Sequence, residues 1–127
     1  MDHIKIAERH VDGITIIELD GRLIFEEGDA PLGDCINRLV RQGYTRIVID
    51  MKKVTRLDSA GIGMLVAKYV TAYMRGGRLK LLNLTNRGEA LMDVTKLITV
   101  FDAFDTEEEA LESFSLHESM QRRPPGL

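Results

Sequence analysis

Apolar and polar positions along the first part of the chain predict a β-hairpin. Residues 4–6 alternate between apolar and polar side chains, Asp12-Gly13 is typical of a two-residue turn, and residues 14–19 resume the apolar pattern. A second turn is expected at Asp20-Gly21, and residues 22–25 then pair briefly with the hairpin.

Two segments in the first half of the chain carry the apolar spacing of helices. One is predicted to begin near Ala30 after a polar loop, and Gly43 is suited to the position just after its last turn. The other covers residues 62–73, which have the clearest helical spacing in the sequence, and it ends at Gly76-Gly77. Each helix has an apolar stripe that needs a core to pack against.

Strands alternate with these helices. Residues 46–50 contain three consecutive β-branched apolar residues, which is typical of a strand covered on both faces, and a polar connection is expected to follow. Residues 78–84 form the next predicted strand, residues 86–94 a further helix, and residues 98–101 a short strand.

The last predicted element is a helix that begins at Thr106 with three acidic residues in its first turn. The order of strands and helices predicts right-handed crossovers in one α/β domain, with a mixed four- to five-stranded sheet and about four α-helices, mostly on one face. We expect the domain to cover residues 1–118 and residues 119–127 to form a flexible tail.

Composition and charge exclude several classes of function. The net charge of −3 comes from interspersed acids and bases, so nothing favours direct binding to nucleic acid. No apolar run is long enough to cross a membrane and no secretion signal is evident, so we expect a cytoplasmic protein. The one cysteine, Cys35, lies on an apolar helix stripe and is interpreted as a small buried hydrophobe.

Residues 57–63, with the sequence LDSAGIG, connect the predicted central strand to the clearest helix and place Ser59 at its start. Backbone amides and the helix dipole favour an anion there. The small residues Ala60 and Gly61 leave room for another protein to approach the hydroxyl. The simpler interpretation is that Ser59 or Asp58 only caps the helix, and spacing alone does not decide between these alternatives.

The sequence gives no support for an enzyme, a metal or a cofactor. Leu57 occupies the place of the first glycine in a Gly-x-Ser-x-Gly elbow, and the three histidines lie near the ends of the chain. Val66 stands where a dinucleotide fingerprint needs its third glycine. We therefore expect no catalytic turnover, no cofactor and no metal site.

The run 46–50 followed by residues 57–63 resembles the STAS domain of anti-sigma factor antagonists. The resemblance extends over most of the chain and includes the glycine pair at 76–77 before the next strand. In that family a serine after the motif aspartate is phosphorylated by an anti-sigma factor that is itself a serine kinase. The resemblance therefore implies Ser59 as the acceptor, and Ala60 offers no competing hydroxyl.

The same resemblance implies partner switching. The unphosphorylated protein binds the anti-sigma factor and releases sigma, phosphorylation ends binding, and a serine phosphatase resets the cycle. The alternative function is a constitutive STAS scaffold, such as a subunit of a membrane-lipid transport complex, in which Ser59 is only a cap. A weak homodimer is a further alternative for the assembly, and no membrane insertion is expected.

The candidate partner-binding residues surround this serine in the expected structure. Asp50 is expected either to help Asp58 position the hydroxyl or to cap the strand-to-helix loop as a structural residue, and these two roles stay open. Family members often have an aspartate shortly after the hairpin glycine, where this chain has an apolar pair, Ile24-Phe25, followed by Glu26 and Glu27. Either glutamate is a candidate substitute, and the apolar pair either contacts a partner or, in the simpler interpretation, is buried. The candidate set is Asp58, Ser59, Ala60, Gly61, Asp50, Glu26 and Ile24.

Overall fold

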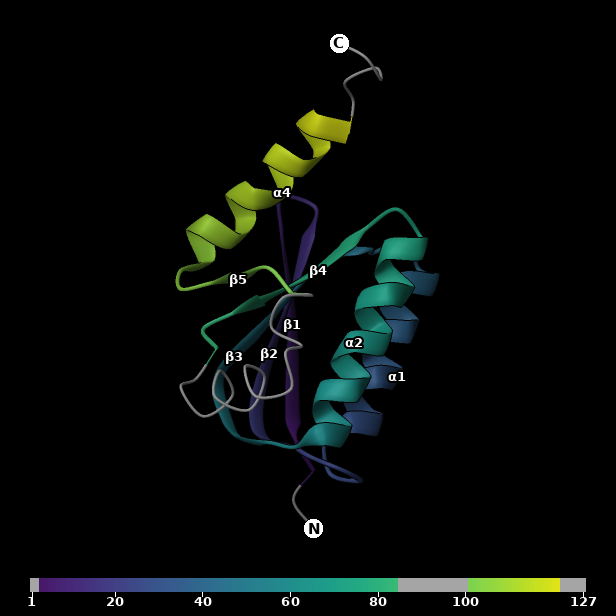
Figure 1. The fold of residues 1–127 in the computed structure, drawn as a ribbon, viewed down its shortest axis with the longest axis vertical. Helices are drawn as coiled ribbons and strands as arrows, with labels where there is room; N and C mark the ends of the chain where they lie inside the picture. Colours follow the sequence, from purple (N-terminus) through teal and green to yellow (C-terminus); the bar gives the residue numbers. More distant parts are fainter. Residues whose placement is uncertain (1–2, 85–100, 122–127) are drawn as a thin grey trace.

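The computed structural model describes residues 3–84 and 101–121, with the side chains of the last helix described as far as residue 115. Its five described strands form one sheet in the order β1-β2-β3-β4-β5 (Figure 1). The first pair is antiparallel and the other three pairs are parallel, so the predicted mixed α/β sheet is confirmed. The strands are β1 (Lys5–Val11), β2 (Ile14–Leu23), β3 (Arg46–Leu57), β4 (Arg78–Leu82) and β5 (Ala103–Phe104).

Helices cover both faces of the sheet. Helices α1 (Asp29–Arg41) and α2 (Ser59–Met74) lie side by side on one face, and α4 (Glu107–Gln121) lies on the other (Figure 1). Successive residues of a strand point to opposite faces of the sheet. Ile17 and Ile49 pack in the core under α1 and α2, whereas Ile16 and Val48 pack against α4. This burial on both faces explains the continuous apolar run at residues 46–50.

Several predicted boundaries agree closely with the structure. Helix α1 begins one residue before the expected Ala30, and Gly43 follows it with a φ of +92°, a conformation that glycine adopts readily. In α4 the Thr106 hydroxyl accepts the Glu109 backbone N–H at 3.2 Å, as a capping residue should. The predicted helix at residues 86–94 lies outside the described residues.

The central strand β3 is much longer than predicted. In place of a polar connection after residue 50, the strand continues to Leu57, and β2 pairs with it in parallel as far as Leu23. Two register shifts put extra residues into β3, so its core positions there fall three residues apart, at Met51, Val54 and Leu57. A strand with this spacing lacks the two-residue alternation of apolar and polar positions by which strands are recognised in a sequence.

The predicted second turn at Asp20-Gly21 is wrong because β2 runs straight through it. Gly21 has a φ of +133°, which side-chain-bearing residues rarely adopt, and it lies where the register with β3 shifts. The dipeptide therefore marks an irregularity in the strand and not a change of direction.

The C-terminal elements also differ from the prediction. β4 ends at Leu82, two residues before the predicted end. Of the strand expected at 98–101, only Phe101 is described, and it forms a bend, while the short edge strand follows at Ala103–Phe104. Helix α4 extends to Gln121, three residues past the predicted domain end, and residues 122–127 lie outside the described residues.

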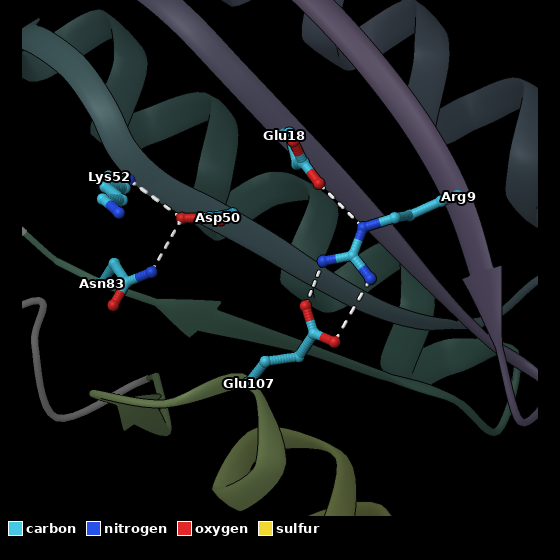
Figure 2. Close-up of polar contacts among 6 residues, drawn as sticks. All are labelled: Arg9, Glu18, Asp50, Lys52, Asn83 and Glu107. Carbon is cyan, nitrogen blue, oxygen red and sulfur yellow. Dashed lines mark hydrogen bonds and ion pairs between the residues drawn. The ribbon is translucent and has the colours of Figure 1, made fainter.

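An ion-pair network fixes the start of α4 against the far side of the sheet. Arg9 of β1 donates to Glu18 of β2 at 2.7 Å and to both carboxylate oxygens of Glu107, the first residue of α4 (Figure 2). These hydrogen bonds raise the pKa of the Arg9 guanidinium and lower the pKa of the Glu107 carboxyl. The network is exposed, so its contribution to stability is small.

Cys35, predicted to be a small buried hydrophobe, packs against the core but is only half-buried. Its thiol donates to Glu8 at 3.3 Å, and burial, together with the Glu8 carboxylate, raises its pKa to about 11. We expect alkylation by iodoacetamide at pH 7.5 to be about 100-fold slower than for an unperturbed thiol, because the thiolate is the reactive form. The matched control is the same chain in urea, and equal rates for folded and unfolded protein would contradict this prediction.

Candidate functional site

Asp58 is the N-cap residue of α2, and Ser59 is the first residue of the helix. The Asp58 backbone is extended, and its Oδ1 accepts the Gly61 backbone N–H at 2.9 Å. Of the two residues considered as caps, the structure therefore selects Asp58. Ser59 is exposed and, within the part of the chain that the structure describes, its hydroxyl makes no hydrogen bond, so it is accessible to a partner.

The same aspartate also holds the loop that follows β2. Its second oxygen, Oδ2, accepts the Phe25 backbone N–H at 3.1 Å. Close packing reinforces this link, because a Cβ on Gly61 would lie 2.2 Å from the Leu23 carbonyl oxygen. The end of β2 and the start of α2 therefore form one rigid unit, although their residues are more than 30 positions apart in the sequence.

The loop itself is a tight turn around the Ile24 carbonyl. This oxygen lies within hydrogen-bond distance of the backbone N–H groups of Glu27, Gly28 and Asp29, at 3.1, 3.0 and 3.4 Å. Glu26 has a φ of +66° and donates its N–H to the Asp29 side chain at 2.9 Å. A left-handed conformation at a non-glycine residue persists only where its surroundings fix it, as they do here.

The two candidate glutamates of this loop differ in exposure and in ion pairing. Glu27 is only partly exposed and pairs with Arg22 at 2.7 Å, whereas Glu26 is exposed. Ile24 is half-buried, but Phe25 keeps 64% of its surface exposed, so the expectation of burial is wrong for the phenylalanine. Of these two glutamates, Glu26 is therefore the one that a partner can reach.

Asp50 does not belong to this site. It is seven residues before the end of β3, which corresponds to on the order of 20 Å of strand. Its Oδ1 accepts hydrogen bonds from the Lys52 backbone N–H at 3.0 Å and from the Asn83 side-chain amide at 3.2 Å (Figure 2). The expectation that Asp50 positions the Ser59 hydroxyl is wrong, and so is the alternative that it caps the strand-to-helix loop, because β3 continues through Asp50 to Leu57. Asp50 instead binds the side chain of Asn83, the residue just after β4 ends.

Of the predicted site residues, the structure brings together Ile24, Glu26, Asp58, Ser59, Ala60 and Gly61 at the end of the sheet where α1 and α2 begin (Figure 1). Within residues 3–84 and 101–121, no three side chains of the metal-binding types form a cluster that could hold an ion. No helix of the described chain is both long and apolar enough to cross a bilayer. The arrangement is an exposed hydroxyl on a rigid surface.

A comparison with protein families identifies the family of this chain. The family model of the STAS domain matches residues 5–110. The chain belongs to the STAS domain family. The matched region contains the whole site, from the β2 loop to α2, as well as every strand of the described sheet.

This STAS domain is similar to anti-sigma factor antagonists. It is 24% identical over 109 residues to the anti-sigma F factor antagonist of Paenibacillus polymyxa, covering 86% of this chain and 93% of the relative. The crystal structure of a putative anti-sigma factor antagonist from Thermotoga maritima has a TM-score of 0.81 at 22% identity, covering 87% of this chain and 94% of that one.

The anti-sigma factor antagonist SpoIIAA has been solved in two forms that share this fold. The unphosphorylated form has a TM-score of 0.66 at 22% identity, covering 86% of this chain and 96% of that one. The phosphorylated form, from Bacillus, has a TM-score of 0.67 at 22% identity, covering 86% and 98%. At these identities the structural comparisons establish the fold, which agrees with the STAS resemblance seen in residues 46–63.

Proposed function

We propose that this STAS protein is an anti-sigma factor antagonist that binds an anti-sigma factor with serine kinase activity and is released when Ser59 is phosphorylated. The observation that carries the proposal is the exposed Ser59 hydroxyl at the first position of α2, next to a cap that Asp58 already provides. The serine is therefore available for modification without loss of the helix cap.

The chemistry of release follows from charge. The partner kinase transfers the γ-phosphoryl group of ATP to the Ser59 oxygen, ADP leaves, and the hydroxyl proton passes to a base of the kinase or to solvent. The phosphate adds about −1.5 to −2 charges. These charges lie beside the Asp58 carboxylate, and their burial in a protein interface is costly. One modification therefore ends binding, and a serine phosphatase restores it.

In this account the chain is a substrate and a regulator, and it has no catalytic turnover of its own. The relative named an anti-sigma F factor antagonist supports the class of partner, and the two forms of SpoIIAA support phosphorylation as the control. The kinase and its ATP place the proposed activity in the cytoplasm, where sigma-dependent transcription occurs.

The test is a titration of purified variants against the anti-sigma factor kinases of the source bacterium. We expect Ser59→Asp to weaken binding about 10-fold or more, because it places a charge at the docking surface, and Ser59→Ala to bind like the wild type. Since Asp58 is the cap, Ser59→Ala should change the free energy of unfolding by less than about 0.5 kcal/mol. The matched control is Ser115→Asp, an exposed serine on α4 across the sheet, which should bind normally.

Equal affinity of the Ser59→Asp and Ser59→Ala variants would contradict the switch. If, in addition, no phosphate were transferred to the wild type, a constitutive STAS scaffold would be the better description. Thermal melts of each variant separate loss of the interface from loss of folding.

A further inference from the structure

Phe25 has an unusual position for a large apolar side chain. It is 64% exposed at the tip of the β2–α1 loop, and its backbone N–H is bonded to Asp58, the residue before Ser59. Covering an exposed phenylalanine ring with another apolar surface removes that area from water and is favourable.

The loop holds Phe25 in a fixed place. The Ile24 carbonyl oxygen gathers the following backbone N–H groups, and Gly28 packs so closely that an added Cβ would lie 2.4 Å from the Arg22 carbonyl oxygen. A partner that binds the ring therefore does not have to order the loop first. Preorganisation of this kind is what allows one side chain to dominate an interface.

The charges around Phe25 indicate what its partner presents. Glu26, the next residue in the chain, is exposed and has no ion pair within the described residues, and the Asp58 carboxylate accepts the Phe25 backbone N–H at 3.1 Å. Glu27 is neutralised by Arg22. Phe25 is therefore followed by an exposed carboxylate and bonded through its backbone to a second one, a setting that suits an apolar pocket bordered by a basic side chain.

We infer that Phe25 is the apolar anchor of the interface with the anti-sigma factor, filling a pocket that has a basic side chain at its edge facing Glu26. This inference rests on the proposed function and deepens it. Phe25 fixes the partner on the surface that contains Ser59, so a partner held by the anchor also covers the hydroxyl. Asp58 acts as a positioning residue, because its two oxygens hold the loop and the helix together.

The test uses the full chain and the purified anti-sigma factor kinases of the source bacterium, with affinity measured by calorimetric titration. We expect Phe25→Ala to weaken binding about 10- to 100-fold and Phe25→Leu to lose less, since it keeps part of the apolar surface. The matched control is Met74→Ala, which removes a 76% exposed apolar side chain at the other end of α2 and should change affinity less than twofold. Both side chains are exposed, so the melting temperatures should stay close to that of the wild type.

A Ser59→Asp arm separates the two claims. If Ser59→Asp loses affinity while Phe25→Ala binds like the wild type, the anchor is overturned and the proposed function stands. If Phe25→Ala loses affinity while Ser59→Asp does not, the anchor stands and the phosphorylation switch fails. If no anti-sigma factor kinase binds the wild type, both are overturned, and equal losses in Phe25→Ala and Met74→Ala overturn the anchor.

Discussion

Replacing Gly61 with alanine is expected to destabilise the domain by about 2–3 kcal/mol, the cost of forcing an extra carbon into a packed site. The added Cβ would lie 2.2 Å from the Leu23 carbonyl oxygen and 3.0 Å from the Leu57 side chain. The closest atom belongs to the backbone, so it cannot rotate away, and β2 and α2 must move apart. Urea unfolding followed by circular dichroism measures this loss.

The matched control lies two residues further along the same helix. Gly63 is exposed, and an added Cβ there would meet nothing within 4 Å. Gly63→Ala should therefore raise the free energy of unfolding by about 0.5–1 kcal/mol, because alanine is the better helix former. Equal effects of the two substitutions would contradict the close contact between the end of β2 and the start of α2.

Lys80 provides the second large effect, because its side chain is only 1% exposed. The ammonium donates to the Ser113 hydroxyl of α4 at 2.8 Å and lies 3.8 Å from the Asp102 carboxylate. The Phe114 ring is 4.4 Å away. Removal of the side chain by Lys80→Ala leaves a cavity under α4, and we expect a loss of about 2–4 kcal/mol in the free energy of unfolding.

The informative control is Lys80→Met, which keeps most of the volume and removes the charge. We expect its stability to be equal to or greater than that of the wild type at pH 7. The desolvation of a buried charge often costs as much free energy as its interactions with neighbouring groups contribute. If Lys80→Met were as unstable as Lys80→Ala, the ammonium and not the packing would hold α4 in place.

The pH dependence of stability gives a further check on Lys80. Burial lowers the pKa of this lysine from its ordinary value of 10.5, so the unfolded chain holds the proton more tightly than the folded chain does. Raising the pH toward 10.5 should therefore increase the free energy of unfolding, and lowering the pH back through this range should decrease it. The difference between wild type and Lys80→Met isolates this effect from other titrating groups, and a difference that does not vary with pH would contradict it.

The elements that could be predicted from sequence are those with strong local signals. Residues 46–50 and the α2 segment show a clear period, and Gly43 is a typical residue just beyond a helix end. The second half of β3 lacks such a signal, because its two irregularities replace the two-residue period with a three-residue one. The turn predicted at Gly21 is wrong because a glycine with a positive φ occurs at strand irregularities as well as in turns.

The candidate site was predicted in part. Ser59 and its small neighbours are adjacent in sequence, so their place at the start of α2 followed from local rules. The bond between Asp58 and Phe25 joins residues 33 positions apart, and no local rule indicates it. The same limit explains Asp50, whose distance from Ser59 depends on the unexpected length of β3.

Phosphorylation of Ser59 by a kinase partner, followed by loss of binding, is the step that we propose for this protein. The most direct measurement incubates the purified wild type and Ser59→Ala with the cognate anti-sigma factor kinase and ATP, locates phosphate by mass spectrometry, and then titrates the modified protein against the kinase. We expect one phosphate, on Ser59, none on the alanine variant, and an affinity at least about 10-fold weaker after modification. Phosphate on another residue, or unchanged affinity of protein phosphorylated on Ser59, would contradict this proposal.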